Sequence, residues 1–215
     1  SLTANLGLLG DIGHAVVEDL LLGSLALLSN HLQGVGGTDA NADAATHTIQ
    51  RRNSQSVGVI GLGDRGKDVP VRFSYIDDAT IVALCDIDSA KVERAQRLLE
   101  WNGSPRAIAE YVGEDAWMEL CQRDDIDLVY LAVPWQYHTK MAVYAMEHGK
   151  HVAIEVPAAT SIEECWALVN TSERTRRHCM MLENCCYGRM ELLVANMVKQ
   201  GLFGDIVHCE GGYRH

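Results

Sequence analysis

The chain has 215 residues, is 47% hydrophobic and carries a formal net charge of −11 with a pI near 5.2, which allows one well-packed domain and an additional segment. This acidity argues against nucleic-acid or anionic-membrane partners, because both require a basic surface on the protein. No apolar run reaches the roughly 18 residues of a membrane span, and the longest, residues 20–28, lacks the basic residues that precede the apolar core of a signal peptide.

The sequence names no compartment, although the missing signal peptide and membrane span slightly favour the cytoplasm. Seven cysteines are present, an odd number, and no two of them form a C-x-x-C pair. We therefore expect reduced structural thiols rather than a disulfide framework, and we expect no metal site.

Residues 1–54 differ in character from the rest of the chain. Residues 16–32 could form a helix, and the polar, glycine-rich stretch "QGVGGTDANADAATHT" that follows is typical of a flexible linker. We assign this segment no function.

From Ser56 onward, short apolar runs alternate with amphipathic stretches. Strands are predicted at residues 57–60, 80–85, 128–133, 151–154 and 179–182. The first helix is predicted near Arg65 and is shortened by Pro70. The second begins after the N-cap Asp88 and ends at Gly103, and the third covers 114–121. The fourth runs from the N-cap Thr139 to 148, and the fifth runs from a capping box at 161–164 to 176. This alternation predicts an α/β Rossmann fold, a doubly wound parallel sheet, over residues 55–185.

A further helix after Tyr187 and a possible strand at 206–211 follow the Rossmann pattern. We interpret residues 186–215 as the truncated start of a second, α+β domain, and the chain as an incomplete fragment.

The stretch "VGVIGLGDRG" places Gly61, Gly63 and Gly66 in a G-x-G-x-x-G pattern between a predicted strand and a predicted helix. In that context the glycines favour a dinucleotide site over a turn without a ligand, because the backbone can approach a pyrophosphate beside a helix N-terminus. Asp86 ends the second predicted strand, 25 positions later (86 − 61). A carboxylate there binds ribose hydroxyls and repels a 2′-phosphate, so we expect NAD rather than NADP. The alternative is that Asp86 only caps a turn, but Asp88 is better placed for that.

Other polar or aromatic side chains also follow predicted strands: Trp135, Tyr137 and His138 after the strand at 128–133, and Glu155, Glu183 and Asn184 after the next two. Carboxyl ends of parallel strands share one edge of the sheet, where a dinucleotide and a substrate bind. Considered alone, Trp135 is more often a packing residue and His138 more often a local cap.

Ser56 to His215 resembles the N-terminal part of the Gfo/Idh/MocA oxidoreductase superfamily, and within it the NAD-dependent α-N-acetylgalactosaminidases of glycoside hydrolase family 109. The stretches that carry this resemblance are "GLGDRG", "IVALCDI", "GEDAW", "CQRDDIDLVY", "PWQYHTKMAVYAMEHGKHVAIEVPAA", "CMMLENCCY" and "QGLFGDIVHCEG". No counterpart is recognised for the first 54 residues.

The resemblance implies one set of NAD contacts and one sugar contact. The NAD contacts are Asp64, Arg65, Asp86, Trp135, Gln136, Tyr137, His138, Glu155, Val156 and Asn184, and the sugar contact is Tyr213. Asp64 replaces an expected methionine, and its carboxylate should point away from the pyrophosphate. The remaining sugar-binding and acid–base groups of the family lie in its C-terminal domain, so no catalytic residue is assigned here. A homo-oligomer formed through that domain stays open.

The implied reaction is transient oxidation at C3 of the sugar, elimination of the C1 substituent, addition of water and return of the hydride, without net redox. The substrate class is a small sugar or glycan with a terminal α-linked N-acetylgalactosamine. Val156 supports this reading, because sugar dehydrogenases of the superfamily usually have Glu-Lys-Pro here, with a lysine that moves a proton. The alternatives are an NAD-dependent sugar dehydrogenase of the same superfamily or, because the chain ends at His215, an inactive NAD-binding fragment.

Overall fold

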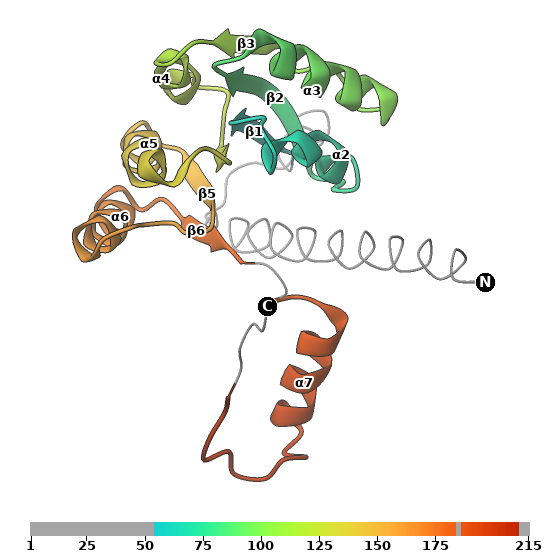
Figure 1. Ribbon diagram of the computed structural model, residues 1–215, viewed down its shortest axis with the longest axis vertical. Coiled ribbons are helices and arrows are strands. Elements are labelled where there is room, and N and C mark those ends of the chain that lie inside the picture. The colour runs from blue at the N-terminus through green and yellow to red at the C-terminus, as the bar shows by residue number, and fades with distance from the viewer. Residues whose placement is uncertain (1–53, 184–185, 211–215) are drawn as a thin grey trace, which may run out of the picture. The chain divides into compact units, whose positions relative to one another are not determined.

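The computed structural model describes residues 54–183 and 186–210, and the chain divides into two units after Glu183 (Figure 1). The helix expected at 16–32, the linker after it, Asn184 and Tyr213 lie outside the described residues.

The larger unit is built on one six-stranded parallel sheet with the order β3-β2-β1-β4-β5-β6. Its strands are β1 (Gln55–Ile60), β2 (Ala79–Asp86), β3 (Ala109–Val112), β4 (Leu128–Leu131), β5 (His151–Glu155) and β6 (Cys179–Leu182). The order reverses between β1 and β4, which is the point in a Rossmann sheet where a ligand crevice opens at the carboxyl edge. The predicted fold class is confirmed.

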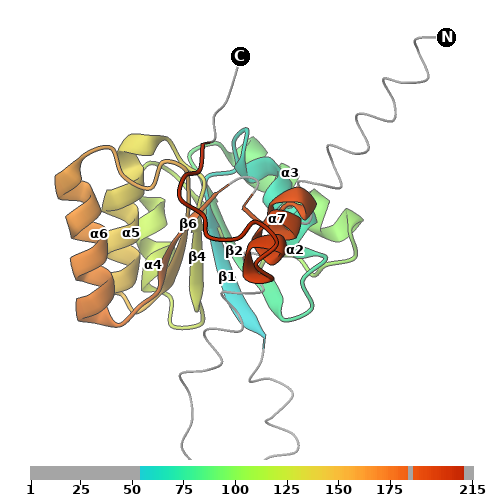
Figure 2. The same ribbon diagram turned by 90° about the horizontal axis from the view of Figure 1, so that it is seen from below.

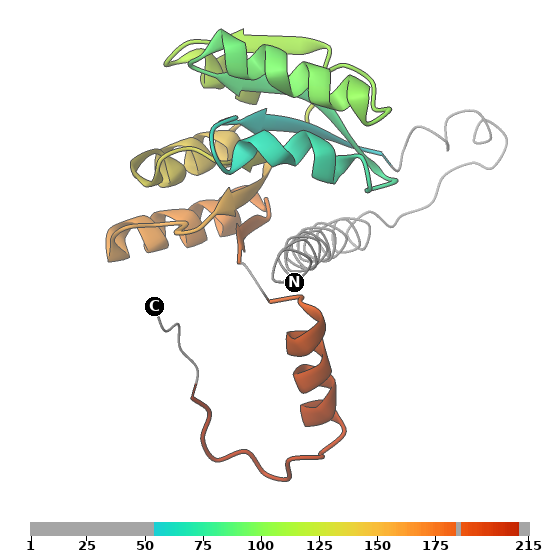
Figure 3. The ribbon, with the colours of Figure 1, turned by 45° about the vertical axis from the view of Figure 1, so that its right-hand side comes forward.

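Helices cover both faces of this sheet (Figure 2). Helices α2 (Val69–Phe73) and α3 (Ser89–Trp101) lie on one face, and α4 (Ala116–Gln122), α5 (His138–Glu147) and α6 (Ile162–Thr175) lie on the other. Figure 3 shows α5 and α6 side by side. Two single-turn 3-10 helices, η2 (Gly66–Asp68) and η3 (Trp135–Tyr137), stand at the starts of α2 and α5.

The core follows from this double cover. All four residues of β4 are buried, as are the last four of β1 and of β5. Strands buried on both faces must be apolar almost continuously, since neither face meets water. This explains the apolar runs from which these strands were predicted.

The helix ends also agree with most of the predicted caps. The Asp88 carboxylate accepts the N–H of Ala90 at 2.9 Å, and Gly103 follows α3 with a φ of +76°. Ser161 Oγ accepts the N–H of Glu164 at 3.2 Å to begin α6. The expected Thr139 cap is wrong, because α5 already begins at His138 and the Thr139 hydroxyl donates to the carbonyl of Ala158.

Two further expectations differ from the structure. Strand β3 was not predicted, because it is a four-residue edge strand whose "AEYV" sequence holds a charge and no apolar run. Residues 206–210 contain no strand, so the strand expected at 206–211 is absent from its described part. The helix expected after Tyr187 is confirmed as α7 (Arg189–Lys199). Among the described helices, none is both long and apolar enough to cross a membrane.

The amino edge of the sheet, opposite the ligand crevice, carries a pair of histidines. The rings of His151 and His178 stack with centroids 5.1 Å apart, and the backbone N–H of His178 donates to His151 Nδ1 at 2.9 Å. Burial lowers the pKa of His151 to about 4, with smaller contributions from His178 and Arg177. The folded protein therefore holds His151 neutral, with Nδ1 as an acceptor.

We expect this pair to make the fold sensitive to mild acid. The unfolded chain binds a proton at His151 near pH 6.5 and the folded chain near pH 4. Stability from neutral His151 is thus fully present above pH 6.5 and is lost as the pH falls toward 4. Because the ring is only half-buried, we expect a loss of roughly 1–2 kcal/mol. His151→Asn keeps a hydrogen-bond acceptor but does not titrate. The variant should therefore lose less free energy of unfolding between pH 7 and pH 4.5, measured by urea unfolding at both pH values. His148→Asn, at an exposed histidine, serves as control. An equal loss of unfolding free energy between pH 7 and pH 4.5 in all three proteins would contradict the role given to His151.

Candidate functional site

The turn after β1 contains three glycines, and the structural reason for a glycine is not the same at each position. Gly61 has a φ of +89°, and a Cβ there would lie 2.4 Å from the carbonyl oxygen of Ala132. A Cβ on Gly66 would lie 1.9 Å from the carbonyl oxygen of Gly61. Gly63 has nothing within 4 Å of the corresponding position. Gly61 and Gly66 thus let the turn pack closely against Ala132, just after β4, and against its own backbone, whereas Gly63 leaves open space at the surface of the loop.

Asp86 ties this loop to the end of β2. Its Oδ2 accepts the N–H of Leu62 at 2.7 Å, and its Oδ1 accepts the N–H of Asp88 at 3.0 Å. The ammonium of Lys91 lies 3.5 Å from Oδ1. Asp86 is 8% exposed. Asp88 caps α3, as expected. The carboxylate of Asp86 lies at the crevice, and the ammonium of Lys91 partly offsets its negative charge.

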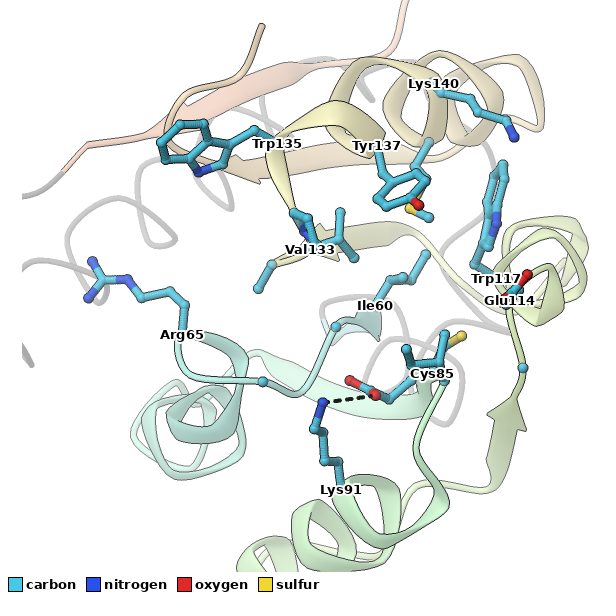
Figure 4. A pocket seen from close by; sticks show the side chains of 18 of the residues that line it. Ile60, Arg65, Cys85, Lys91, Glu114, Trp117, Val133, Trp135, Tyr137 and Lys140 are labelled. Carbon is cyan, nitrogen blue, oxygen red and sulfur yellow. Dashed lines mark ion pairs between the residues drawn. The ribbon is translucent and has the colours of Figure 1, made fainter. Parts of the chain in front are cut away.

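A pocket of about 660 Å³ opens at the carboxyl edge of the sheet (Figure 4), a size typical of sites for small ligands and cofactors. Figure 4 shows Arg65 and Trp135 at one end of this pocket, and Glu114, Trp117 and Lys140 at the other. The pocket brings together seven of the predicted residues: Gly61, Gly63, Asp64, Arg65, Asp86, Trp135 and Tyr137.

Other predicted residues are not part of the pocket lining. Gly66 is buried in the turn, Gln136 is exposed on η3 and Val156 is half-buried after β5. His138 is buried, and its ring nitrogens face the carbonyls of Val133 at 2.8 Å and Pro157 at 2.7 Å. His138 therefore links the segments after β4 and β5. The ligand contacts of these residues stay predictions, as do those of Asn184 and Tyr213.

Glu155 is likewise buried and is not part of the pocket lining. Its Oε1 accepts the hydroxyl of Tyr130 at 2.6 Å, and its Oε2 lies 3.3 Å from Nε of Arg65. Both carboxylate oxygens thus face groups of the protein.

Five charged or aromatic residues of the lining were missed by the sequence analysis: Lys91, Glu114, Asp115, Trp117 and Lys140. Glu114 and Trp117 follow β3, and because that strand was not predicted, its loop was not assigned to the carboxyl edge. Trp117 is 3% exposed, and the ammonium of Lys140 lies 5.6 Å from the centroid of its ring. The signal for Lys91 was present in the sequence, three residues after the N-cap Asp88.

Cys85 also lines the pocket, and its chemistry is decided by burial. Burial, followed by the charge of Asp86, raises the pKa of this thiol to about 12. Because the thiolate is the reactive form, Cys85 is not a nucleophile at neutral pH. The described residues contain no group of three or more metal-ligating side chains.

The residues present fit a dinucleotide. The open space at Gly63 admits a phosphate close to the backbone, Arg65 supplies a cation at that end, and Asp86 supplies acceptors for ribose hydroxyls.

Comparisons with known proteins agree with this geometry. Residues 55–183 match the GFO_IDH_MocA family, described as an oxidoreductase family with an NAD-binding Rossmann fold. Residues 187–215 match the C-terminal domain of glycosyl hydrolase 109.

Curated relatives give the same result. A glycosyl hydrolase family 109 protein of Porphyromonas gingivalis is 47% identical over 208 residues, covering 95% of this chain and 44% of the relative. Residues 55–215 number only 161 (215 − 54), so that alignment reaches into the first 54 residues. An alpha-N-acetylgalactosaminidase of Bacteroides fragilis is 54% identical over 156 residues, covering 73% of this chain and 36% of the relative. The chain thus spans less than half the length of these relatives.

A solved structure shares the fold. The WlbA dehydrogenase of Chromobacterium violaceum, in complex with NADH and UDP-GlcNAcA, has a TM-score of 0.59 and 21% identity over 71% of this chain and 41% of that chain. The Rossmann sheet, the pocket at its carboxyl edge and the matched sequences lead to one assignment. The chain belongs to the Gfo/Idh/MocA oxidoreductase family with an NAD-binding Rossmann fold, and its similar relatives are glycosyl hydrolase family 109 proteins.

Proposed function

We propose that the protein carrying this chain is an NAD-dependent glycosidase that removes terminal α-linked N-acetylgalactosamine. The observation that carries the proposal is a dinucleotide-sized pocket, with a glycine loop and Asp86, in a chain whose second matched region is the family 109 C-terminal domain. The name of the Bacteroides fragilis relative supports the substrate class.

Each part of the pocket has a role in this function. The loop around Gly63 and the guanidinium of Arg65 bind the diphosphate, and the Asp86 carboxylate accepts hydrogen bonds from ribose hydroxyls. The exposed rings of Trp135 and Tyr137 offer apolar faces beside it. Bound NAD would supply a transient hydride acceptor, which allows elimination and hydration of the sugar without net redox.

Val156 favours hydrolysis over net oxidation. Its half-buried isopropyl group stands in the position where sugar dehydrogenases of the superfamily usually have lysine. An alkyl side chain cannot carry a proton from a sugar hydroxyl, so a net dehydrogenase would be at a disadvantage.

We also propose that the cofactor domain covers residues 55–185 and that residues 186–215 begin a second domain. The matched ranges, 55–183 and 187–215, support this division.

The experiment that tests the function follows two signals at once. The whole protein is incubated with a chromogenic α-N-acetylgalactosaminide in D₂O, while leaving-group release and NADH absorbance are recorded. We expect release of the leaving group without accumulation of NADH, and deuterium at C2 of the product. Stoichiometric NADH without glycoside cleavage would instead identify a sugar dehydrogenase. Cleavage with no deuterium at C2 would exclude the elimination route.

A further inference from the structure

A network of three polar side chains, Tyr130, Glu155 and Arg65, connects the central strand β4 to the glycine loop. The Tyr130 hydroxyl donates to Glu155 Oε1 at 2.6 Å, and Glu155 Oε2 lies 3.3 Å from Nε of Arg65. Exposure to solvent rises along this network: Tyr130 is 0% exposed, and the side chains of Glu155 and Arg65 are 8% and 41% exposed. The network thus connects the buried core to the guanidinium of Arg65 at the pocket.

We propose that Tyr130 and Glu155 are positioning residues, which hold the guanidinium of Arg65 at the glycine-loop end of the pocket so that it binds the diphosphate of a nucleotide. This inference rests on the proposed function in one respect only, that the ligand is a dinucleotide. It assigns Glu155 a role through Arg65 rather than through direct contact with the ligand.

Tyr130 is suited to a fixed donor. It lies on β4 with its ring edge-on to Phe73, at 6.2 Å between centroids and 85° between planes. Burial, and then the negative charge of Glu155, raise the pKa of its phenol well above the usual value. The hydroxyl therefore keeps its proton across the physiological range and always donates to Glu155. A hydrogen bond of this kind restrains a buried carboxylate, and the carboxylate in turn restrains the arginine that it faces.

Arg65 is the basic residue of the loop that would surround a diphosphate. It stands between Gly63 and Gly66 and lines the pocket with Gly63. The other two cations of the lining have different partners, since Lys91 faces Asp86 and Lys140 lies over the ring of Trp117. Figure 4 shows Arg65 at the end of the pocket away from Lys140. Guanidinium groups bind phosphate oxygens in a defined geometry, so their orientation determines the gain in affinity.

The test removes one oxygen atom and compares three ligands. Tyr130→Phe keeps the ring and its packing but deletes the donor to Glu155. Binding of ADP and NAD to the full chain is measured by calorimetry, and binding of adenosine by ligand-observed NMR. We expect Tyr130→Phe to weaken ADP and NAD to a similar extent, by roughly tenfold, and to leave adenosine unchanged because it carries no phosphate.

Two further variants decide between positioning and general structural damage. Tyr111→Phe is the matched control. Tyr111 lies on the edge strand β3, outside the pocket, and its hydroxyl is 3.4 Å from Arg123. This variant should not alter the binding of any of the three ligands. Arg65→Gln should reproduce the loss for ADP and NAD, and adding Tyr130→Phe to it should cause no further loss.

The outcomes separate this inference from the proposed function. If the unmodified chain binds NAD but Tyr130→Phe weakens adenosine equally, or weakens NAD without weakening ADP, the positioning role is overturned. Additive losses in the double variant would also overturn it. If the unmodified chain binds neither ADP nor NAD, the proposed cofactor is wrong and this inference falls with it.

Discussion

Replacing Gly66 with alanine should lower the free energy of unfolding by about 3 kcal/mol or more. The added Cβ would lie 1.9 Å from the carbonyl oxygen of Gly61, and that oxygen belongs to the backbone of a turn packed against Ala132, just after β4. The turn cannot move away easily, because Gly61 itself approaches the carbonyl of Ala132 and donates its N–H to Cys85 at 2.9 Å. Urea unfolding, followed by circular dichroism, measures the loss.

Gly63→Ala is the matched control, since it makes the same chemical change three residues earlier in the same loop. Nothing lies within 4 Å of its added methyl group, so stability should change by less than about 1 kcal/mol. Affinity for NAD should nevertheless fall, because the methyl group enters the pocket. Equal destabilisation by both variants would contradict the division of these glycines into a packing role and a ligand role.

The sheet could be predicted from the sequence because its central strands are buried on both faces. The "VGVI" run has no polar side chain and the "LVYL" run has only the Tyr130 hydroxyl. The residues that cap α3 and α6 mark where these helices begin. Strand β3 escaped prediction because an edge strand with alternating exposure needs only two half-buried residues. Its pairing with β2 is a tertiary effect that no local pattern encodes.

The site was predictable to the extent that it follows predicted strands. Gly63, Asp86 and Trp135 were found because each follows a strand that was expected, and the pocket brings them together. Trp117 was missed with β3, and Tyr130 was missed because it lies inside a strand. An inward hydroxyl that contacts a neighbouring strand end has no signature in its own sequence window. The buried environment of Glu155 was hidden for the same reason.

Replacing Asp86 with asparagine should change which dinucleotide the chain prefers. In the proposed complex, the carboxylate accepts hydrogen bonds from ribose hydroxyls and repels a 2′-phosphate. Hydrogen bonds to a charged group contribute roughly 1.5–3 kcal/mol, so NAD affinity should fall about tenfold to a hundredfold. Lys91, now without its anionic neighbour at 3.5 Å, would face the 2′-phosphate and should strengthen NADP binding. Calorimetric titration of both cofactors measures the ratio of the two dissociation constants.

Two variants of the same region make this test specific. Lys91→Gln should act in the opposite direction and widen the preference for NAD, because it removes the cation that offsets the charge of Asp86. Asp88→Asn is the control for loss of one negative charge: asparagine also caps a helix, and Asp88 caps α3 without lining the pocket. Its cofactor preference should remain that of the unmodified chain. If the unmodified chain bound NAD and NADP equally, or if Asp86→Asn and Asp88→Asn behaved alike, Asp86 would serve only to hold Leu62 and the glycine loop. The choice of cofactor would then have to come from another part of the pocket.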